Sequence, residues 1–164
     1  MNRRIIDTPV GRLELSARDG RLCRIRLALK EAAPAGEDPV LDEAERQLRA
    51  YFAGERKTFD VPLLMEGSEF DRAVWQQLLE IPFGQIRTYG QLAAALGKRN
   101  ASRAVGGACS RNPLLIVVPC HRVIAGTGKL TGFAAGMDMK RTLLELEGFD
   151  IRKDRVSMKL NRAE

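Results

Sequence analysis

Residues 88–124, TYGQLAAALGKRNASRAVGGACSRNPLLIVVPCHRVI, contain the pattern that decides how the second part of this chain folds. Thr88 suits a helix N-cap, and Gly97 suits the end of the short helix that follows it. After a basic turn, residues 101–111 predict a second short helix, which Asn112 and Pro113 stop. Two short helices joined by a tight turn predict a helix-turn-helix.

The second of these helices is unusual because almost all of its residues are small. Gly106 and Gly107 each cost about 1 kcal/mol relative to alanine inside a helix. Small residues allow a backbone to lie close to a neighbour. That neighbour is either another helix of the same protein or the groove of a nucleic acid, with Arg103 projecting from the small-residue surface. Both interpretations stay open at this point.

Residues 116–124, IVVPCHRVI, carry the reactive groups of the stretch. Cys120 is followed by His121, the only histidine of the chain. A thiolate is a nucleophile, and a nearby base that removes its proton activates it. In an extended strand the two side chains would diverge, so either the chain turns at the proline or a water molecule carries the proton. The histidine also needs a partner on its other ring nitrogen, and Glu145 and Glu147 are the nearest candidates.

The cysteines and the single histidine do not favour a metal or a disulfide framework. Three cysteines, Cys23, Cys109 and Cys120, are few and odd in number, and no CxxC pair accompanies the histidine. We therefore predict no metal, and we interpret Cys23 and Cys109 as small core residues. Free thiols, with no leader-like or membrane-length apolar segment, favour the cytoplasm and no membrane partner.

The basic residues are unevenly distributed along the chain. The net charge is +6, yet residues 81–137 hold seven Lys and Arg and no Asp or Glu. Surface charges normally mix in sign. A chance asymmetry and a polyanionic partner, most simply nucleic acid, are about equally good explanations.

The flanking sequence predicts an α+β protein with a small β-rich N-terminal domain and a mostly helical C-terminal domain. Period-two segments predict strands around a Pro-Val-Gly turn and again after Asp19 and Gly20, and a short strand is predicted over 58–63. Helical patterns occupy 41–52, a segment ending at Leu79, and 137–147. We predict domains over 1–66 and 67–150, and a disordered basic tail over 151–164.

Several of these motifs together resemble one family. Pro119-Cys-His-Arg122, Ser102-Arg-Ala-Val-Gly-Gly-Ala108, the Asn112–Pro113 pair, Tyr89 and Leu146-Glu-Gly148 resemble the O6-alkylguanine-DNA alkyltransferases, or methylated-DNA–protein-cysteine methyltransferases. The resemblance implies irreversible, single-turnover transfer of an alkyl group from O6-alkylguanine, and from O4-alkylthymine, in duplex DNA to cysteine. It implies base flipping from the minor groove, no cofactor, a ribonuclease H-like N-terminal domain, and a monomer that can cluster on DNA.

The same resemblance implies roles for individual residues. Cys120 would be the acceptor and His121 a base acting through water, while Glu147 orients the histidine and Asn112 holds the network. Tyr89 would hydrogen-bond the purine and help to rotate the phosphate, and Arg103 would fill the space left by the flipped base. The implied DNA contacts are Tyr89, Ser102, Arg103, Ala104, Gly106, Gly107 and Arg111, and the implied pocket is Tyr89, Val118, Pro119, Gly132, Phe133 and Ala134.

Two departures and two alternatives accompany the resemblance. Phe133 stands where the family often has tyrosine, and Leu115 where some members have proline, which would widen the pocket. Alkyltransferase-like proteins recognise alkylguanine without repairing it, but they lack the acceptor that Cys120 provides here. A helix-turn-helix transcription regulator would not need the PCHR sequence.

Overall fold

The computed structural model describes residues 1–29, 36–133 and 135–159 of the chain, and it is α+β, as predicted. The chain divides into two compact units. One comprises Met1–Glu66 with Pro113–Val117, and the other comprises Gly67–Asn112 with Val118–Glu164. The segment 113–117 therefore belongs with the first unit, although the sequence pattern had placed it in the second domain.

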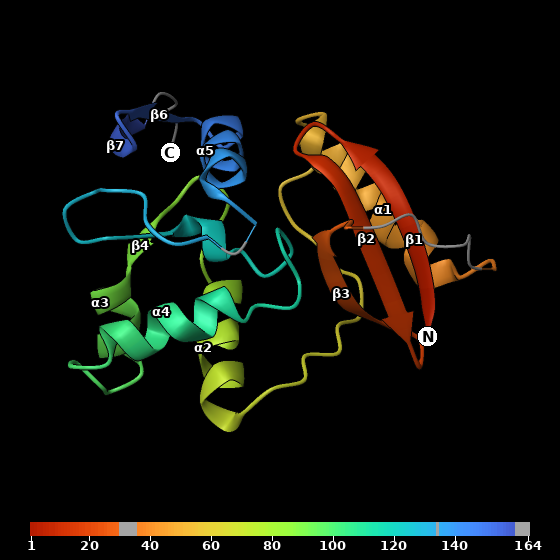
Figure 1. The fold of residues 1–164 in the computed structure, drawn as a ribbon, viewed down its shortest axis with the longest axis horizontal. Helices are drawn as coiled ribbons and strands as arrows, with labels where there is room; N and C mark the ends of the chain where they lie inside the picture. Colours follow the sequence, from red (N-terminus) through yellow and green to blue (C-terminus); the bar gives the residue numbers. More distant parts are fainter. Residues whose placement is uncertain (30–35, 134, 160–164) are drawn as a thin grey trace. The chain divides into compact units, whose positions relative to one another are not determined.

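The first unit is a three-stranded antiparallel sheet with one helix packed on it (Figure 1). Pairing of Ile6 with Leu13 and of Leu15 with Ile25 aligns the apolar side chains that face the core. The helix begins where the Asp38 carboxylate accepts from the amides of residues 40 and 41. The elements are β1 (Asn2–Thr8), β2 (Gly11–Arg18), β3 (Arg21–Leu27) and α1 (Pro39–Phe52).

Two segments without regular structure lie along β3. Leu22 forms an isolated bridge with Leu63, so the strand predicted over 58–63 was wrong beyond this single contact. Further along β3, the Ile25 amide donates to the Pro113 carbonyl at 2.8 Å. Ile116 then has a φ of 75°, and the amide after it donates to the carbonyl before it at 2.8 Å, a γ-turn that is rare and strained. The apolar run before Pro119 is therefore not a core strand.

The second unit is mostly helical (Figure 1). Ser68 caps its first helix, and Thr88 and Gln91 form a reciprocal capping box at the start of a short one. Two two-residue strands pair in parallel, with Thr88 opposite Ile124, which brings the start of α3 beside the segment that follows Cys120. The elements are α2 (Glu69–Leu79), β4 (Arg87–Thr88), α3 (Tyr89–Ala95), α4 (Ser102–Ser110), the 3₁₀ turn η1 (Cys120–Arg122), β5 (Val123–Ile124) and α5 (Met137–Leu146).

Helix α4 packs against both α2 and α3, and its small residues allow this close approach. The buried Trp75 indole donates to the Ala108 carbonyl at 2.9 Å. Trp75 also requires glycine at position 67, where a Cβ atom would lie 2.5 Å from the indole. Internal packing therefore accounts for part of the small-residue composition of α4.

The chain ends in a hairpin, where the sequence pattern had predicted disorder. Strands β6 (Phe149–Arg152) and β7 (Arg155–Lys159) pair in antiparallel fashion beside α5 (Figure 1). The predicted disorder was therefore wrong as far as Lys159, and residues 160–164 lie outside the described part. Within the described ranges no helix is both long and apolar enough to cross a membrane.

Candidate active site

The backbone that leads into Cys120 makes a tight turn, and two hydrogen bonds to the Val118 carbonyl hold that turn. Pro119 has φ −84° and ψ 62°, and the Cys120 amide donates to the Val118 carbonyl at 2.8 Å, which is an inverse γ-turn. The Asn112 side chain donates to the same carbonyl at 2.7 Å. The chain then enters η1, where successive side chains are about 120° apart. Cys120 and His121 therefore face different partners, Asn112 and Glu147 respectively.

The Cys120 thiol is enclosed and hydrogen-bonded. Its side chain is 4% exposed, and the sulfur accepts from Asn112 Nδ2 at 3.1 Å. Burial raises the pKa of this thiol, whereas the Asn112 donor and the nearby Lys140 charge favour the thiolate. Burial also raises the pKa of Cys109, to about 12, although the Lys140 charge favours its thiolate too. The hydrogen bond from Asn112 is therefore the feature that distinguishes Cys120 from Cys109.

His121 belongs to a buried cluster of charged groups. Its Nε2 lies 2.7 Å from Glu147 Oε2, and the Arg122 guanidinium donates to both oxygens of the same carboxylate, at 2.8 and 3.0 Å. The Gly84 amide also donates to Glu147, at 3.1 Å. Burial raises the pKa of Glu147, but the bonds from His121 and Arg122 outweigh it and lower the value to about 2. The carboxylate is therefore ionised and fixes the orientation of the imidazole ring.

The other ring nitrogen of His121 faces the protein interior. Nδ1 is buried and has no hydrogen-bond partner among the described residues. Burial lowers the pKa of the ring more than Glu147 raises it, so the imidazole is neutral at neutral pH. With Nε2 held by an ionised carboxylate, Nδ1 is the nitrogen that can accept a proton.

Tyr89 and Lys140 meet at one backbone carbonyl. The Tyr89 hydroxyl donates to the Thr131 carbonyl at 3.2 Å, and Lys140 Nζ donates to it at 3.0 Å. The ammonium also donates to the Val123 carbonyl at 2.6 Å and lies 5.9 Å from the centre of the Tyr89 ring. Burial raises the pKa of Tyr89 and lowers that of Lys140 to about 8. Both groups therefore keep their protons at neutral pH.

Sequence reasoning missed Arg122 and Lys140 as members of this site. Arg122 was part of the motif that carries the family resemblance, but the sequence analysis gave it no role. In the structure its guanidinium donates two hydrogen bonds to the Glu147 carboxylate. Lys140 is fully buried on a helix whose other buried side chains include Leu143 and Leu144. The spacing of Lys140 from Leu143 and Leu144 could have revealed it, because it places the lysine on the apolar face of a helix, where its ammonium group needs buried acceptors.

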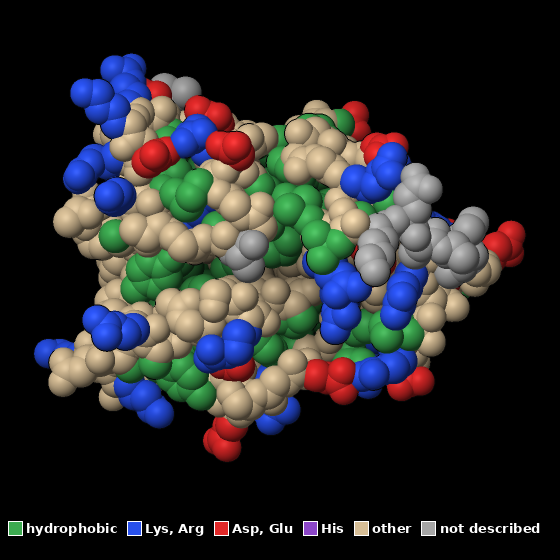
Figure 2. All heavy atoms as spheres, in the orientation of Figure 1, with side chains coloured by type: hydrophobic (Ala, Val, Ile, Leu, Met, Phe, Trp, Pro, Cys, Tyr) green, Lys and Arg blue, Asp and Glu red, His purple; other side chains and the backbone are tan. Residues whose placement is uncertain are grey.

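The residues predicted to contact DNA lie on and around α4. Arg103 and Ala104 are exposed, whereas Ser102 and the two glycines are half-buried, with Gly106 beside the Tyr89 ring. Figure 2 shows Lys and Arg side chains distributed over the α3–α4 part of the surface. Arg111 forms a double ion pair with Asp71, at 2.8 and 2.9 Å, so its guanidinium already has a partner within the unit.

The predicted pocket wall is only partly described. Val118 and Pro119 form the turn before Cys120, and Gly132 and Phe133 follow the carbonyl that binds Tyr89. Gly132 has a φ of 42°, a backbone conformation that favours glycine. Ala134 lies outside the described residues.

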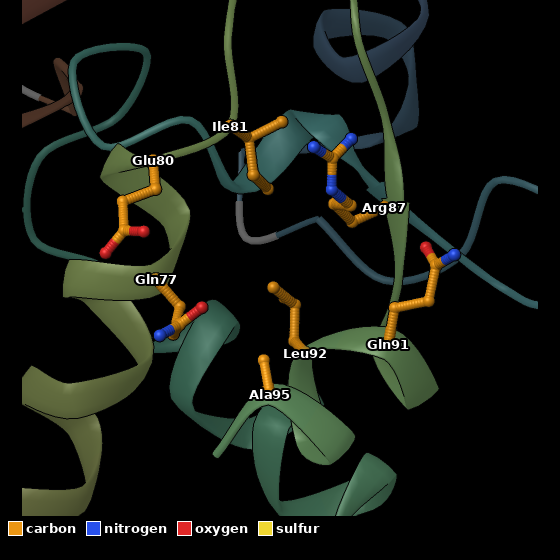
Figure 3. Close-up of a pocket in the computed structure, with 7 residues that line it drawn as sticks. All are labelled: Gln77, Glu80, Ile81, Arg87, Gln91, Leu92 and Ala95. Atoms are coloured by element: carbon orange, nitrogen blue, oxygen red, sulfur yellow. The ribbon is translucent and has the colours of Figure 1, made fainter.

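A separate cavity of about 270 Å³ lies between α2 and α3. Figure 3 shows its side chains converging from both helices and from β4. None of the residues predicted for the substrate pocket lines it. The lining residues are Gln77, Glu80, Ile81, Arg87, Gln91, Leu92 and Ala95.

Comparison with known proteins covers both parts of the chain. Residues 69–149 match the 6-O-methylguanine DNA methyltransferase DNA-binding domain, and residues 1–65 match the ribonuclease-like domain of the same proteins. A methylated-DNA–protein-cysteine methyltransferase of Mycolicibacterium paratuberculosis is 48% identical over 149 residues, which cover 88% of this chain and 90% of the relative. One from Methanosarcina acetivorans is 61% identical over 106 residues, covering 65% and 68% of the two chains.

Solved structures agree with these sequence matches. Mycobacterium tuberculosis OGT in complex with DNA is 44% identical, with a TM-score of 0.83 over 90% of this chain and 92% of the other. An O6-methylguanine DNA methyltransferase from Methanococcus jannaschii is 31% identical, with a TM-score of 0.66 over 98% and 100% of the two chains. The chain therefore belongs to the methylated-DNA–protein-cysteine methyltransferase family.

Proposed function

We propose that this protein repairs DNA by transferring the alkyl group of O6-alkylguanine, and of O4-alkylthymine, to Cys120 in a single turnover. The observation that carries the proposal is the hydrogen-bonded Cys120 thiol beside the buried His121–Glu147 pair. Family membership assigns the reaction class, and the Asn112 donor on the Cys120 sulfur favours the thiolate against the effect of burial.

The chemical step follows from the order of these groups. The thiol proton passes through a water molecule to His121 Nδ1, and the resulting imidazolium is stabilised by the ionised Glu147. The sulfur then forms a bond to the alkyl carbon while the bond from that carbon to guanine O6 breaks. The electron pair of the broken bond stays on the purine, which takes up the proton that the His121 imidazolium returns through water and so becomes guanine. The products are an S-alkyl cysteine and the repaired base, so the protein is consumed.

Tyr89 is proposed to donate a hydrogen bond from its hydroxyl group to the purine. Burial keeps this hydroxyl protonated, and its present acceptor is the Thr131 carbonyl at 3.2 Å. Lys140 remains on the same carbonyl when Tyr89 turns to the purine, so that carbonyl keeps a donor. The Lys140 charge also favours the Cys120 thiolate.

We further propose that α3 and α4 act as a helix-turn-helix that enters the minor groove. In this proposal Arg103, which is exposed, occupies the stack left by the flipped base, where an arginine can also bond the orphaned partner base. Residues 81–137 carry no acidic side chain that would repel the phosphates. The protein is proposed to act as a monomer that can cluster on DNA, in the reducing cytoplasm that its free thiols suit.

Intact mass measurement after incubation with duplex DNA containing one O6-methylguanine tests the reaction. We expect the protein to gain one methyl group, located at Cys120, in a stoichiometric reaction, and we expect no gain in Cys120→Ser. Cys109→Ser is the matched control and should still gain the methyl group. Absence of a gain in the wild type, or an undiminished gain in Cys120→Ser, would overturn the proposal.

Base flipping is tested by comparing two substrates in Arg103→Ala. Repair of duplex DNA should fall far more than reaction with free O6-methylguanine, because only the duplex requires a base to be extruded. Arg99→Ala, an exposed neighbour on the preceding turn, controls for the loss of one positive charge. Equal losses on both substrates would remove Arg103 from the flipping role.

A further inference from the structure

The C-terminal hairpin is tied to the loop that follows the reactive segment. The Leu130 amide donates to the Asp154 carbonyl at 2.7 Å, and the Val156 amide donates to the Gly128 carbonyl at 2.9 Å. The Arg155 guanidinium reaches the Thr127 carbonyl at 2.7 Å. Residues 125–131, here called the post-acceptor loop, are therefore held along their length by β7 and by the turn that precedes it.

The hairpin turn has a conformation that its own residues do not favour. Lys153 and Asp154 have φ values of 52° and 57°, and two-residue turns of this kind normally use asparagine and glycine. Strained backbone persists only where surrounding contacts hold it in place. Here those contacts are an ion pair from Arg141 to the Asp154 side chain and the Leu130 amide on the Asp154 carbonyl.

Apolar packing joins the same elements. Leu130 of the loop and Phe149 of β6 belong to one buried cluster with Ile124 and Leu144. Ile151 and Val156, from the two strands of the hairpin, pack against this cluster with Ile86 and Met137. The matched family model ends at residue 149, where the hairpin begins.

The loop leads directly to the groups beside the acceptor. Thr131 follows Leu130, and its carbonyl accepts from both the Tyr89 hydroxyl and Lys140 Nζ. A displacement of Leu130 would move this carbonyl and thereby the two donors. We propose that the β6–β7 hairpin is a clamp on the post-acceptor loop. By fixing the Thr131 carbonyl, it sets the resting position from which Tyr89 turns to the purine and keeps Lys140 in place during alkyl transfer. This inference rests on the proposed function, because it assigns the hairpin to that reaction.

Two variants loosen the clamp to different degrees. Val156→Pro removes the amide that donates to the loop, and Arg155→Ala removes only the side-chain bond to Thr127. Ser157→Ala is the matched control, because its hydroxyl bonds to Asp150 within the hairpin and to no loop residue. Urea unfolding followed by the fluorescence of Trp75, the single tryptophan, shows which variants are folded.

The test is a double-mutant cycle with Tyr89→Phe, measured as the rate constant of transfer from free O6-benzylguanine. If the clamp acts through Tyr89, Val156→Pro should slow transfer about tenfold in the wild-type background and much less in the Tyr89→Phe background. Arg155→Ala should show the same pattern with a smaller loss, and Ser157→Ala should react at the wild-type rate. Equal losses in the two backgrounds, or no loss in either clamp variant, would overturn the inference. Failure of the proposed function itself would appear differently, as a wild-type protein that takes up no alkyl group.

Discussion

Replacing Glu147 by glutamine tests the buried charge cluster quantitatively. The ordinary pKa of 4.5 falls to about 2 in the folded protein, a difference that corresponds to roughly 3 kcal/mol of stability at neutral pH. A lowered carboxyl pKa stabilises the fold above the unfolded value, and this contribution is lost as pH falls from about 4.5 toward 2. At pH 7, Glu147→Gln should lower the free energy of unfolding by about 3–5 kcal/mol, because Arg122 stays buried without its carboxylate.

The pH dependence distinguishes this explanation from a general packing defect. By pH 3.5 the wild type should have lost roughly 1 kcal/mol of the Glu147 contribution, so the gap between the two proteins should narrow by that amount. Urea unfolding monitored through Trp75 measures the gap at each pH, since this residue is buried in the same unit. His121 also affects stability at low pH, because its lowered pKa costs stability below about pH 6.5. Repeating the comparison in a His121→Asn background removes this second contribution.

A neighbouring carboxylate provides the control for this experiment. Glu145 lies in the last turn of α5, two residues before Glu147, and is exposed, so Glu145→Gln should change stability by less than about 0.5 kcal/mol. A gap between wild type and Glu147→Gln that stays constant from pH 7 to pH 3.5 would refute the reasoning, because the carboxylate would then not be held ionised by its partners.

Three further predictions concern the acceptor and the packing around it. Asn112→Ala removes the donor to the Cys120 sulfur and should slow alkyl transfer on the order of 100-fold, measured in single-turnover assays; an unchanged rate would remove Asn112 from the site. Because burial raises the pKa of Cys120, the thiolate fraction and the transfer rate should rise from pH 6 to pH 8. Lys140→Met should move this rise to higher pH, whereas a rate that falls with pH would contradict it. Gly67→Ala should cost about 1–3 kcal/mol in urea unfolding because its Cβ would meet the Trp75 indole, while Gly36→Ala, in open space, should cost little; equal effects would contradict the packing argument.

Local patterns predicted most helices because capping residues act within one turn. Thr88 and Ser68 cap the helices that follow them, and the helix predicted over 137–147 ends at Leu146, with Gly148 at a φ of 100°. The C-terminal hairpin was missed because its turn, Lys153–Asp154, lacks the glycine that usually marks one. The order of that turn depends on contacts with residues distant in sequence, such as Leu130, which no local pattern contains.

The adjacency of Cys120 and His121 made them a candidate pair in the sequence, but their geometry could not be predicted from it. Two consecutive γ-turn contacts, at Ile116 and at Pro119, set the direction of Cys120, and isoleucine gives no sequence signal for a positive φ. Glu147 was one of two candidate partners for the histidine until the family resemblance singled it out. That Arg122 holds the same carboxylate depends on tertiary contacts over 25 residues, which a single sequence does not reveal.

The burial of Cys120 is consistent with a protein that acts once. Exposed cysteines with low pKa values are the ones that oxidise most readily, and an oxidised acceptor would be a molecule lost to repair. Burial raises the pKa of Cys120 and so keeps the thiol protonated and protected, at the expense of resting reactivity. Asn112 donates to the sulfur and Lys140 contributes its charge, so both limit the rise in the Cys120 pKa before any substrate is bound. In the proposed single-turnover reaction the alkyl group stays on the sulfur, so the enclosure around Cys120 would have to admit a substrate base only once.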